Sequence, residues 1–309
     1  MIKPTISIVI PCFNEEGNVA NTYRELNLII DSESQYNFEF IFTDNHSTDN
    51  TFKELNALAD KDSRIKIYRF SKNFGYQKSI YTGYMKSSGS AAIQIDADLQ
   101  DPPTLIPSFL RHWEQGFKVV YGIRKTRKSN FLLTFMTQLF YRLLDNLSEA
   151  PLPRNAGECR LLDRVIIEEL SKIKDNDIYI RGRIAELGFD QKGIEYERRD
   201  RQAGQTKFTF INLIRLSADA ITGHSIIPLR LASYLGLLML TFSTIGTIGF
   251  IFSKVFFGHD WPAGFTTIII LILTLNGLNS LLIGILGEYI GRIHQQLKNN
   301  PEAIIEEER

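Results

Sequence analysis

The stretch "AAIQIDADLQDPP", residues 91–103, places three carboxylates and one amide directly after a short apolar run. Asp96 and Asp98 are two positions apart, so in an extended segment their side chains leave the same side of the chain. Asp101 precedes two prolines, a position where Asp commonly caps a helix. Carboxylates gathered in this way repel one another unless a cation or a donor compensates them. We therefore expect a buried strand, a pair of acidic ligands and then a helix start.

The sequence around this stretch, from residue 1 to about 225, alternates short apolar runs with amphipathic ones. The expected strands are "TISIVIP", "FEFIFTD", "IKIYRF", "AAIQI" and "KVVYG". Between them, residues 15–30, the stretch after Asp49 and residues 76–88 carry apolar side chains at helical spacing. This alternation predicts an α/β domain, with a mostly parallel sheet covered by helices on both faces.

Polar side chains follow three of the predicted strands. The first strand runs into Asn14 and Glu15, the second into Asp44, and the fourth into Asp96 and Asp98. Parallel strands present their carboxyl ends at one edge of the sheet, where α/β proteins bind their ligands. Any one of these side chains could be a helix cap, but three groups at one edge favour a site.

The composition excludes several classes of protein. Lys plus Arg equals Asp plus Glu at 35 each, so no global charge favours nucleic acid. The two cysteines, Cys12 and Cys159, make no disulfide framework and fit a reducing compartment. The apolar part of the N-terminus is too short for a signal peptide. No dinucleotide or P-loop glycine motif, zinc spacing or nucleophile elbow is present. Oxygen-ligand chemistry remains, and it suits a hard cation, Mg²⁺ or Mn²⁺.

Two long uncharged runs lie near the C-terminus, at residues 231–252 and 265–286. Each has about the 20 residues that a helix needs to cross a membrane. We predict two transmembrane helices in a membrane domain of residues 229–295, with buried core helices as the alternative. Arg230 and Arg292 flank the spans, which predicts that both termini, including the tail 296–309, are cytoplasmic.

Two further features concern the membrane and assembly. Residues 131–147 and 208–221 read as amphipathic helices that lie at the membrane interface, although ordinary core helices would show the same pattern. Small residues at helical spacing in and after the second span, including Gly284 and Gly287, suit close helix packing and allow a homo-oligomer.

Eight motifs together carry a resemblance to a known family. They are "IVIPCFNEEGNV", "FTDNHSTDNT", "FSKNFGYQKSIYTGYMKSSG", "IQIDADLQDPP", "GIRKTR", "GECRLLDR", "RQAGQTKF" and "GILGEYIGRIHQQLKNNP". In this order they resemble glycosyltransferase family 2, over nearly the whole chain. More closely they resemble its polyprenyl-phosphate glycosyltransferases, which include the bactoprenol glucosyltransferases and the dolichol-phosphate mannose synthases.

The resemblance implies a GT-A fold and an inverting transfer of a sugar from a nucleotide-sugar to undecaprenyl phosphate. A UDP-sugar such as UDP-glucose is the implied donor, and the implied location is the bacterial inner membrane, where the product serves cell-envelope or O-antigen glycans. A processive polysaccharide synthase is one alternative, but such enzymes carry a QxxRW motif and more spans. A non-catalytic scaffold is another, although it would not need to keep Asp96, Asp98 and Gln100.

The resemblance also assigns residues to roles. Asp44 would bind the uracil, and Pro11, Asn14 and Glu15 would lie near the nucleotide. Asp96 would act at the donor, while Asp98 and Gln100 would hold the divalent metal against the diphosphate. The groups implied to hold phosphates are Arg124, Arg127, Arg201, Gln205 and Lys207.

Glu158 stands where the family motif usually has the Asp of G-D-F-R, so the resemblance implies that it inherits the role of catalytic base. A phosphate monoester has a second pKa of about 6 and is largely ionised at neutral pH. A strong base is therefore not required, and Glu158 could instead orient the acceptor or sugar. An ion pair with Arg160 is the purely structural alternative.

Overall fold

The computed structural model describes residues 3–125, 156–173, 179–197, 264–297 and 303–309, together with single residues between 234 and 256. The chain divides into two compact units, which are described separately. One comprises Met1–Asp145, Ala150–Lys207 and Asn299–Arg309, and the other comprises Asn146–Glu149 and Phe208–Lys298.

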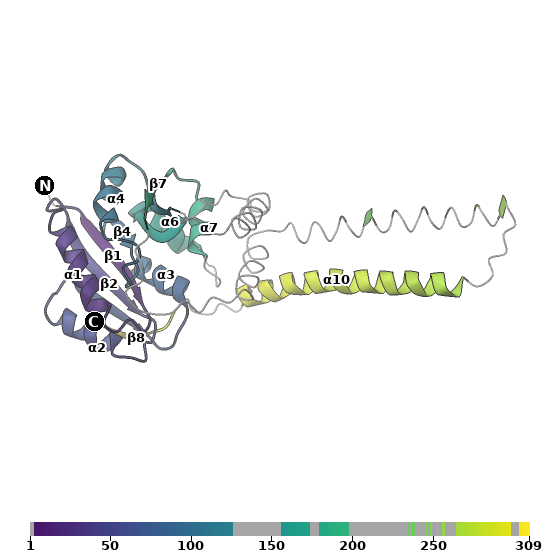
Figure 1. Ribbon diagram of the computed structural model, residues 1–309, viewed down its shortest axis with the longest axis horizontal. Helices are drawn as coiled ribbons and strands as arrows, with labels where there is room; N and C mark the ends of the chain where they lie inside the picture. The colour runs from purple at the N-terminus through teal and green to yellow at the C-terminus, as the bar shows by residue number, and fades with distance from the viewer. Residues whose placement is uncertain are drawn as a thin grey trace. The chain divides into compact units, whose positions relative to one another are not determined.

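The first unit is built on a sheet of eight strands in the order β7-β5-β6-β4-β1-β2-β3-β8 (Figure 1). Its centre consists of parallel strands, as the sequence predicted. These are β1 (Thr5–Cys12), β2 (Asn37–Asp44), β3 (Ile65–Phe70) and β4 (Ala91–Gln94), while β5 (Val119–Arg124) lies beyond β6.

Three strands were not predicted from the sequence. β6 (Ala156–Asp163) runs antiparallel between β4 and β5, and β7 (Gln191–Tyr196) pairs in parallel with β5. β8 (Ile305–Glu308), from the end of the chain, pairs antiparallel with β3 and covers that edge of the sheet. The tail therefore belongs to the α/β unit.

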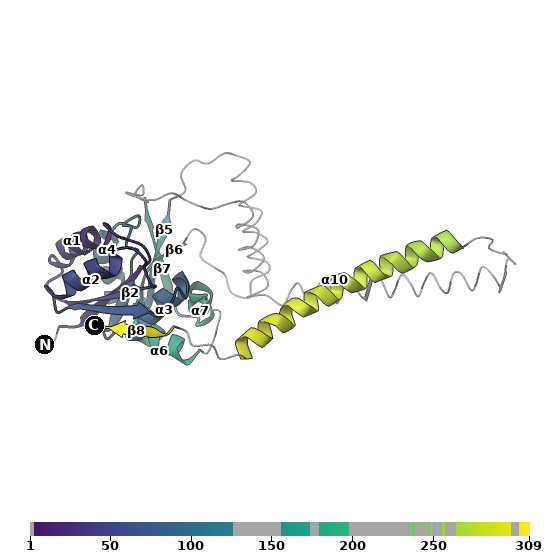
Figure 2. The same cartoon turned by 90° about the horizontal axis from the view of Figure 1, so that it is seen from below.

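Helices cover both faces of the sheet (Figures 1 and 2). The apolar side chains of α1 (Val19–Ile30), α2 (Thr51–Ala59) and α4 (Leu105–Glu114) pack in one core cluster. Those of α3 (Tyr76–Lys86), α6 (Arg164–Lys172) and α7 (Ile180–Glu186) pack in another.

The alternation along β2 shows how the two cores form. Phe40 and Phe42 are fully buried in the first cluster, while Ile41 between them is fully buried in the second. Successive side chains of a strand point to opposite faces, so a continuous apolar run fills both cores. Each such burial contributes about 1.5–3 kcal/mol.

The second unit contains α10 (Phe265–Leu297). Within the described residues, no helix combines the length and apolar character needed to cross a membrane. The predicted span 231–252 falls largely outside these residues, and the predicted span 265–286 lies within α10. The predicted interfacial helices, 131–147 and 208–221, also lie outside the described residues, so both spans and both interfacial helices stay predictions.

Candidate active site

The carboxyl ends of β1, β2 and β4 meet at one edge of the sheet, because the three strands are adjacent and parallel. Cys12 at the end of β1 is in register with Asp44 at the end of β2. One residue, Ile95, separates the end of β4 from the acidic segment that begins at Asp96. The polar groups expected at the strand ends therefore share this edge.

Asp44 is fully buried and only partly partnered. Its Oδ1 accepts a hydrogen bond from the backbone N–H of Ser47 at 3.1 Å. Its Oδ2 lies 3.7 Å from Nε of Arg69 and has no hydrogen-bond partner among the described residues. A buried carboxylate oxygen without a donor is costly, so Asp44 is suited to receive an N–H from a ligand.

The segment after β1 is held against the segment after β2. Asn14, with a backbone φ of 55°, accepts from the backbone N–H of Thr48 at 2.9 Å. The backbone N–H of Glu15 donates to Oγ1 of Thr51 at 2.8 Å. Pro11 is buried within β1. These contacts give one side of the site a defined backbone path.

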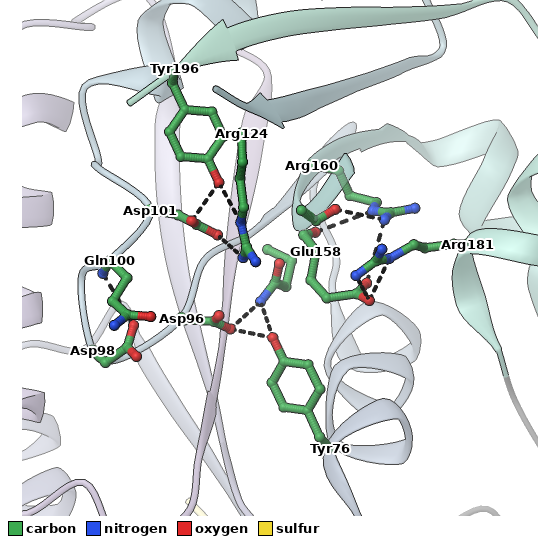
Figure 3. Close-up of polar contacts among 12 residues, drawn as sticks. Tyr76, Asp96, Asp98, Gln100, Asp101, Arg124, Glu158, Arg160, Arg181 and Tyr196 are labelled. Carbon is green, nitrogen blue, oxygen red and sulfur yellow. Dashed lines mark hydrogen bonds and ion pairs between the residues drawn. The ribbon is translucent and has the colours of Figure 1, made fainter. Parts of the chain in front are cut away.

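Asp96 is held by neutral donors (Figure 3). The hydroxyl of Tyr76 and the amide of Gln94, at 2.8 Å, both donate to its Oδ1. Burial and the neighbouring carboxylates raise the pKa of Asp96 to about 7, although the hydrogen bond from Tyr76 lowers it. In the described ranges, no basic side chain contacts Asp96.

Asp98 and Gln100 follow in the same segment. Oδ1 of Asp98 accepts from the backbone N–H of Gln100 at 3.1 Å, and Leu99 between them has a left-handed backbone with a φ of 53°. This turn brings the carboxylate and the amide of the predicted metal pair to the same short bend (Figure 3).

Asp101 does not cap a helix, so that prediction is wrong. α4 begins at Leu105 with Thr104 at its N-cap position. The carboxylate of Asp101, 1% exposed, instead accepts from the hydroxyl of Tyr196 at 2.5 Å and from Nη2 of Arg124 at 3.1 Å. Its partners lie on β7 and β5, where tertiary contacts outweigh the local preference for a cap.

Glu158 lies on β6 between two arginines (Figure 3). Its Oε1 accepts from Nε of Arg181 at 2.6 Å, and its Oε2 lies 3.4 Å from Nη2 of Arg160. Gln77 also donates to Oε1 at 3.2 Å. Burial alone would raise the pKa of Glu158, but the positive charges of Arg160 and Arg181 lower it below its ordinary value.

The oxygen ligands at this edge would supply only part of the coordination shell of a hard cation. Within the described residues, no group of three His, Cys, Asp or Glu side chains is arranged to hold a metal ion. Asp98 and Gln100 supply one carboxylate and one amide oxygen, the ligand types that Mg²⁺ accepts. Mg²⁺ usually takes one or two protein carboxylates and completes its shell with waters and substrate phosphates, so the residues present fit such a shared site.

Several expected site residues lie outside the described residues, namely Arg127, Arg201, Gln205 and Lys207. Conversely, the structure places four side chains at the site that the sequence did not single out for a role there: Tyr76, Gln94, Arg181 and Tyr196. Only Gln94 carried a local signal, as the one polar residue of an apolar strand.

The fold is that of an α/β protein whose candidate site lies at the carboxyl ends of its parallel strands, where such proteins bind their ligands. Residues 7–171 match the family model "Glycosyl transferase family 2". The chain belongs to this family, and it is a glycosyltransferase with the GT-A form of the Rossmann-like fold.

Curated relatives match nearly the full length of the chain. The uncharacterized glycosyltransferase YkcC of Bacillus subtilis (strain 168) is 36% identical, with 97% of this chain and 93% of that protein covered. The SfII prophage-derived bactoprenol glucosyl transferase of Shigella flexneri is 33% identical, with 97% of each chain covered. A prophage bactoprenol glucosyl transferase homolog of Escherichia coli (strain K12) is 33% identical, with 97% and 98% covered.

Among solved structures, glucosyl-3-phosphoglycerate synthase of Mycobacterium tuberculosis superposes with a TM-score of 0.50 at 19% identity. The match covers 71% of this chain and 76% of that one. That structure was determined in complex with Mn²⁺, UDP and phosphoglyceric acid. At this level of identity, the likeness supports the fold.

Proposed function

We propose that the protein transfers a sugar, with inversion, from a UDP-sugar to a polyprenyl phosphate such as undecaprenyl phosphate. An oxygen of the acceptor phosphate forms the new bond to the anomeric carbon, and the bond from that carbon to the nucleoside diphosphate breaks. The observation that carries the proposal is the bend of Asp98 and Gln100, followed at once by Asp101, which accepts from Arg124. This arrangement would bring cation ligands and a phosphate-binding group into one segment. The relatives named bactoprenol glucosyl transferase support the acceptor class.

At the donor end, Asp44 would bind the base. Its buried Oδ2 lacks a donor among the described residues, and the imide N–H of uracil is a donor of the right kind. Asn14 and Glu15 line the neighbouring backbone segment, with Pro11 in the strand below.

Asp98 and Gln100 would hold Mg²⁺ or Mn²⁺ together with the diphosphate. When bound, the metal supplies positive charge that stabilises the negative charge developing on the leaving group. Asp96, which already accepts from Tyr76 and Gln94, would face the donor sugar and fix its orientation.

The acceptor phosphate needs cations more than it needs a base. Guanidinium groups bind phosphate oxygens through paired N–H donors, and Arg124 would contribute such a contact, together with Arg127, Arg201, Gln205 and Lys207. Because Arg160 and Arg181 hold Glu158 in its ionised form, we assign Glu158 to ordering these arginines. The acceptor, already ionised at neutral pH, does not depend on it for proton removal.

We further propose that residues 231–252 and 265–286 attach the enzyme to the bacterial inner membrane, with the α/β unit and both termini on the cytoplasmic side. Their uncharged length and the flanking basic residues support this topology. A lipid-linked acceptor would then lie at the surface where the catalytic unit works. The small-residue faces formed by Ser280 with Gly284 and by Gly287 with Gly291 support a homo-oligomer.

One incubation tests the proposal. The full-length protein in detergent is supplied with undecaprenyl phosphate, Mg²⁺ or Mn²⁺, and a panel of labelled nucleotide-sugars. We expect one UDP-sugar to give a labelled, butanol-extractable lipid whose formation stops when the metal is chelated. If no donor in the panel labels the lipid, the proposed reaction is wrong. If label appears only with a phosphoglycerate-type soluble acceptor, the acceptor class is wrong.

A further inference from the structure

Three side chains next to the predicted metal pair form a closed triangle (Figure 3). The hydroxyl of Tyr196 donates to Oδ1 of Asp101 at 2.5 Å, and Nη2 of Arg124 donates to Oδ2 at 3.1 Å. Nε of Arg124 donates to the hydroxyl of Tyr196 at 3.1 Å, which closes the triangle. Each member therefore holds the other two.

Asp101 and Tyr196 are buried, Arg124 is partly exposed with 31% of its side chain accessible, and two glycines lie against the triangle. Asp101 is 1% exposed and Tyr196 is 6% exposed. A Cβ at Gly157 would lie 3.1 Å from the Tyr196 hydroxyl and 3.2 Å from Nε of Arg124. A Cβ at Gly122 would lie 2.6 Å from Cε1 of Tyr196. A side chain at Gly122 would require the ring of Tyr196 to shift, and one at Gly157 would crowd the tyrosine hydroxyl and Arg124.

Among the described residues, the contacts of Arg124 leave it with donors for a ligand. A guanidinium carries five N–H donors in a rigid fork, and the triangle uses two of them. The anchoring carboxylate, Asp101, directly follows the Asp98–Gln100 bend. The same triangle thus fixes the direction of the arginine and ties it to the segment that carries the predicted metal ligands.

We propose that Asp101 and Tyr196 are positioning residues, which aim the free donors of Arg124 at a phosphate oxygen of a substrate. The proposal rests on the proposed function in taking Arg124 as a phosphate-binding group. The shared chemistry is a phosphate oxyanion, which either the donor diphosphate or the acceptor monophosphate can supply.

A double-mutant cycle between Tyr196→Phe and Arg124→Ala tests this inference. Tyr196→Phe keeps the ring and removes only the hydroxyl, so the fold should persist. Since misplacing a binding group by about 1 Å can cost on the order of 10²-fold, we expect kcat/KM to fall by about tenfold to hundredfold. In the Arg124→Ala background the same change should have no further effect, because the residue it orients is gone.

The KM values for the two substrates identify which phosphate Arg124 contacts. A rise in KM for the nucleotide-sugar assigns the oxyanion to the donor, and a rise in KM for the polyprenyl phosphate assigns it to the acceptor. Tyr36→Phe is the matched control. Its hydroxyl donates to Glu114, which also accepts from Nη1 of Arg111 at 3.0 Å, and Tyr36 precedes the amino end of β2, away from the candidate site. This control should leave kcat/KM unchanged.

The inference is overturned if Tyr196→Phe lowers kcat/KM by the same factor with and without Arg124, or leaves it unchanged in the wild-type background. A crystal structure of Tyr196→Phe gives a readout that does not depend on turnover. The guanidinium of Arg124 should leave its place beside Asp101, and an unmoved guanidinium would refute the positioning role. The wild-type assay alone decides the proposed function, so the two failures are distinguishable.

Discussion

Two carboxylates on neighbouring strands of this sheet are treated in opposite ways. Glu158 on β6 lies between Arg160 and Arg181, which lower its pKa in spite of its burial. Asp96, just past β4, accepts from the neutral groups of Tyr76 and Gln94 in the described part of the chain, and burial with the nearby carboxylates raises its pKa to about 7. Among the described residues, cationic side chains contact the carboxylate of Glu158, whereas only neutral donors contact that of Asp96.

The difference divides the site into two halves. The half around Glu158 is electrostatically complete, so its carboxylate stays ionised and is a weak acceptor of protons. The half around Asp96 and Asp98 gathers negative charge that a bound cation and its ligands would compensate. Substitutions should therefore act on stability in the first half and on catalysis in the second.

The largest effect is expected in the half that lacks a countercharge. Asp98→Ala removes the carboxylate of the predicted metal pair, and we expect kcat/KM for sugar transfer to fall on the order of 10³-fold, because charge stabilisation of the leaving group is lost. Binding of Mn²⁺ with UDP, measured by calorimetry, should weaken in parallel, while the melting temperature stays near that of the wild type. Full activity of the variant would remove the metal assignment.

The second-largest effect is expected around Glu158, where the carboxylate already has its countercharges. Glu158→Gln leaves the buried Arg160 and the partly exposed Arg181 without their carboxylate, so we expect a loss of about 3 kcal/mol in unfolding free energy. A general base contributes about 10²–10⁴-fold to rate, whereas we expect transfer per folded molecule to fall by less than about tenfold. Thermal melts measure the expected loss of stability, and kcat measured across pH measures the expected small change in transfer rate.

Glu158→Asp is the control, since it keeps the charge and should retain more of the stability than Glu158→Gln. The result that would reverse the comparison is a melting temperature close to the wild type combined with loss of the basic limb of the pH–rate profile. In that case Glu158 would be the base, and its arginines would be tuning a catalytic group.

The comparison also shows what the sequence can and cannot predict. The central strands and the order of polar groups at their ends follow from local apolar runs, such as the one in β2 that fills two cores. β6, β7 and β8 escape such reasoning, because sequences like "QKGIEY" and "IEEE" become strands only through the neighbours that pair with them.

The same limit applies to the site. The acidic pair Asp96 and Asp98 stands out because its members are two residues apart, whereas the family resemblance assigned the metal to Asp98 and Gln100, which stays a prediction. The partners of Asp101 are 23 and 95 residues away along the chain, so its local context suggested a helix cap. Arg160 was a foreseeable partner of Glu158, whereas Arg181, on α7, reaches it only in the folded sheet.

The smallest effect concerns carboxylates remote from the chemistry. Glu39, 7% exposed, accepts from Nζ of Lys66 at 2.8 Å and from Oγ of Ser7 at 2.6 Å. Burial opposes the shift, but these donors lower its pKa to about 2 from an ordinary 4.5. Because the folded pKa lies below the unfolded one, the stabilisation is present above about pH 4.5 and is lost as pH falls toward 2.

Glu39→Gln should therefore cost about 1–3 kcal/mol near pH 7, with a melting-temperature gap to wild type that narrows below pH 4.5 and with unchanged transfer activity. Glu308→Gln is the matched comparison, because Glu308 also pairs with a lysine, Lys86 at 3.3 Å, but its side chain is 56% exposed. Exposed pairs contribute little, so its cost should be about 0.5 kcal/mol or less. Equal stability costs at the two positions would show that burial does not determine how much a paired carboxylate stabilises this fold. The contrast between Asp96 and Glu158 would then need a cause other than their contacting side chains.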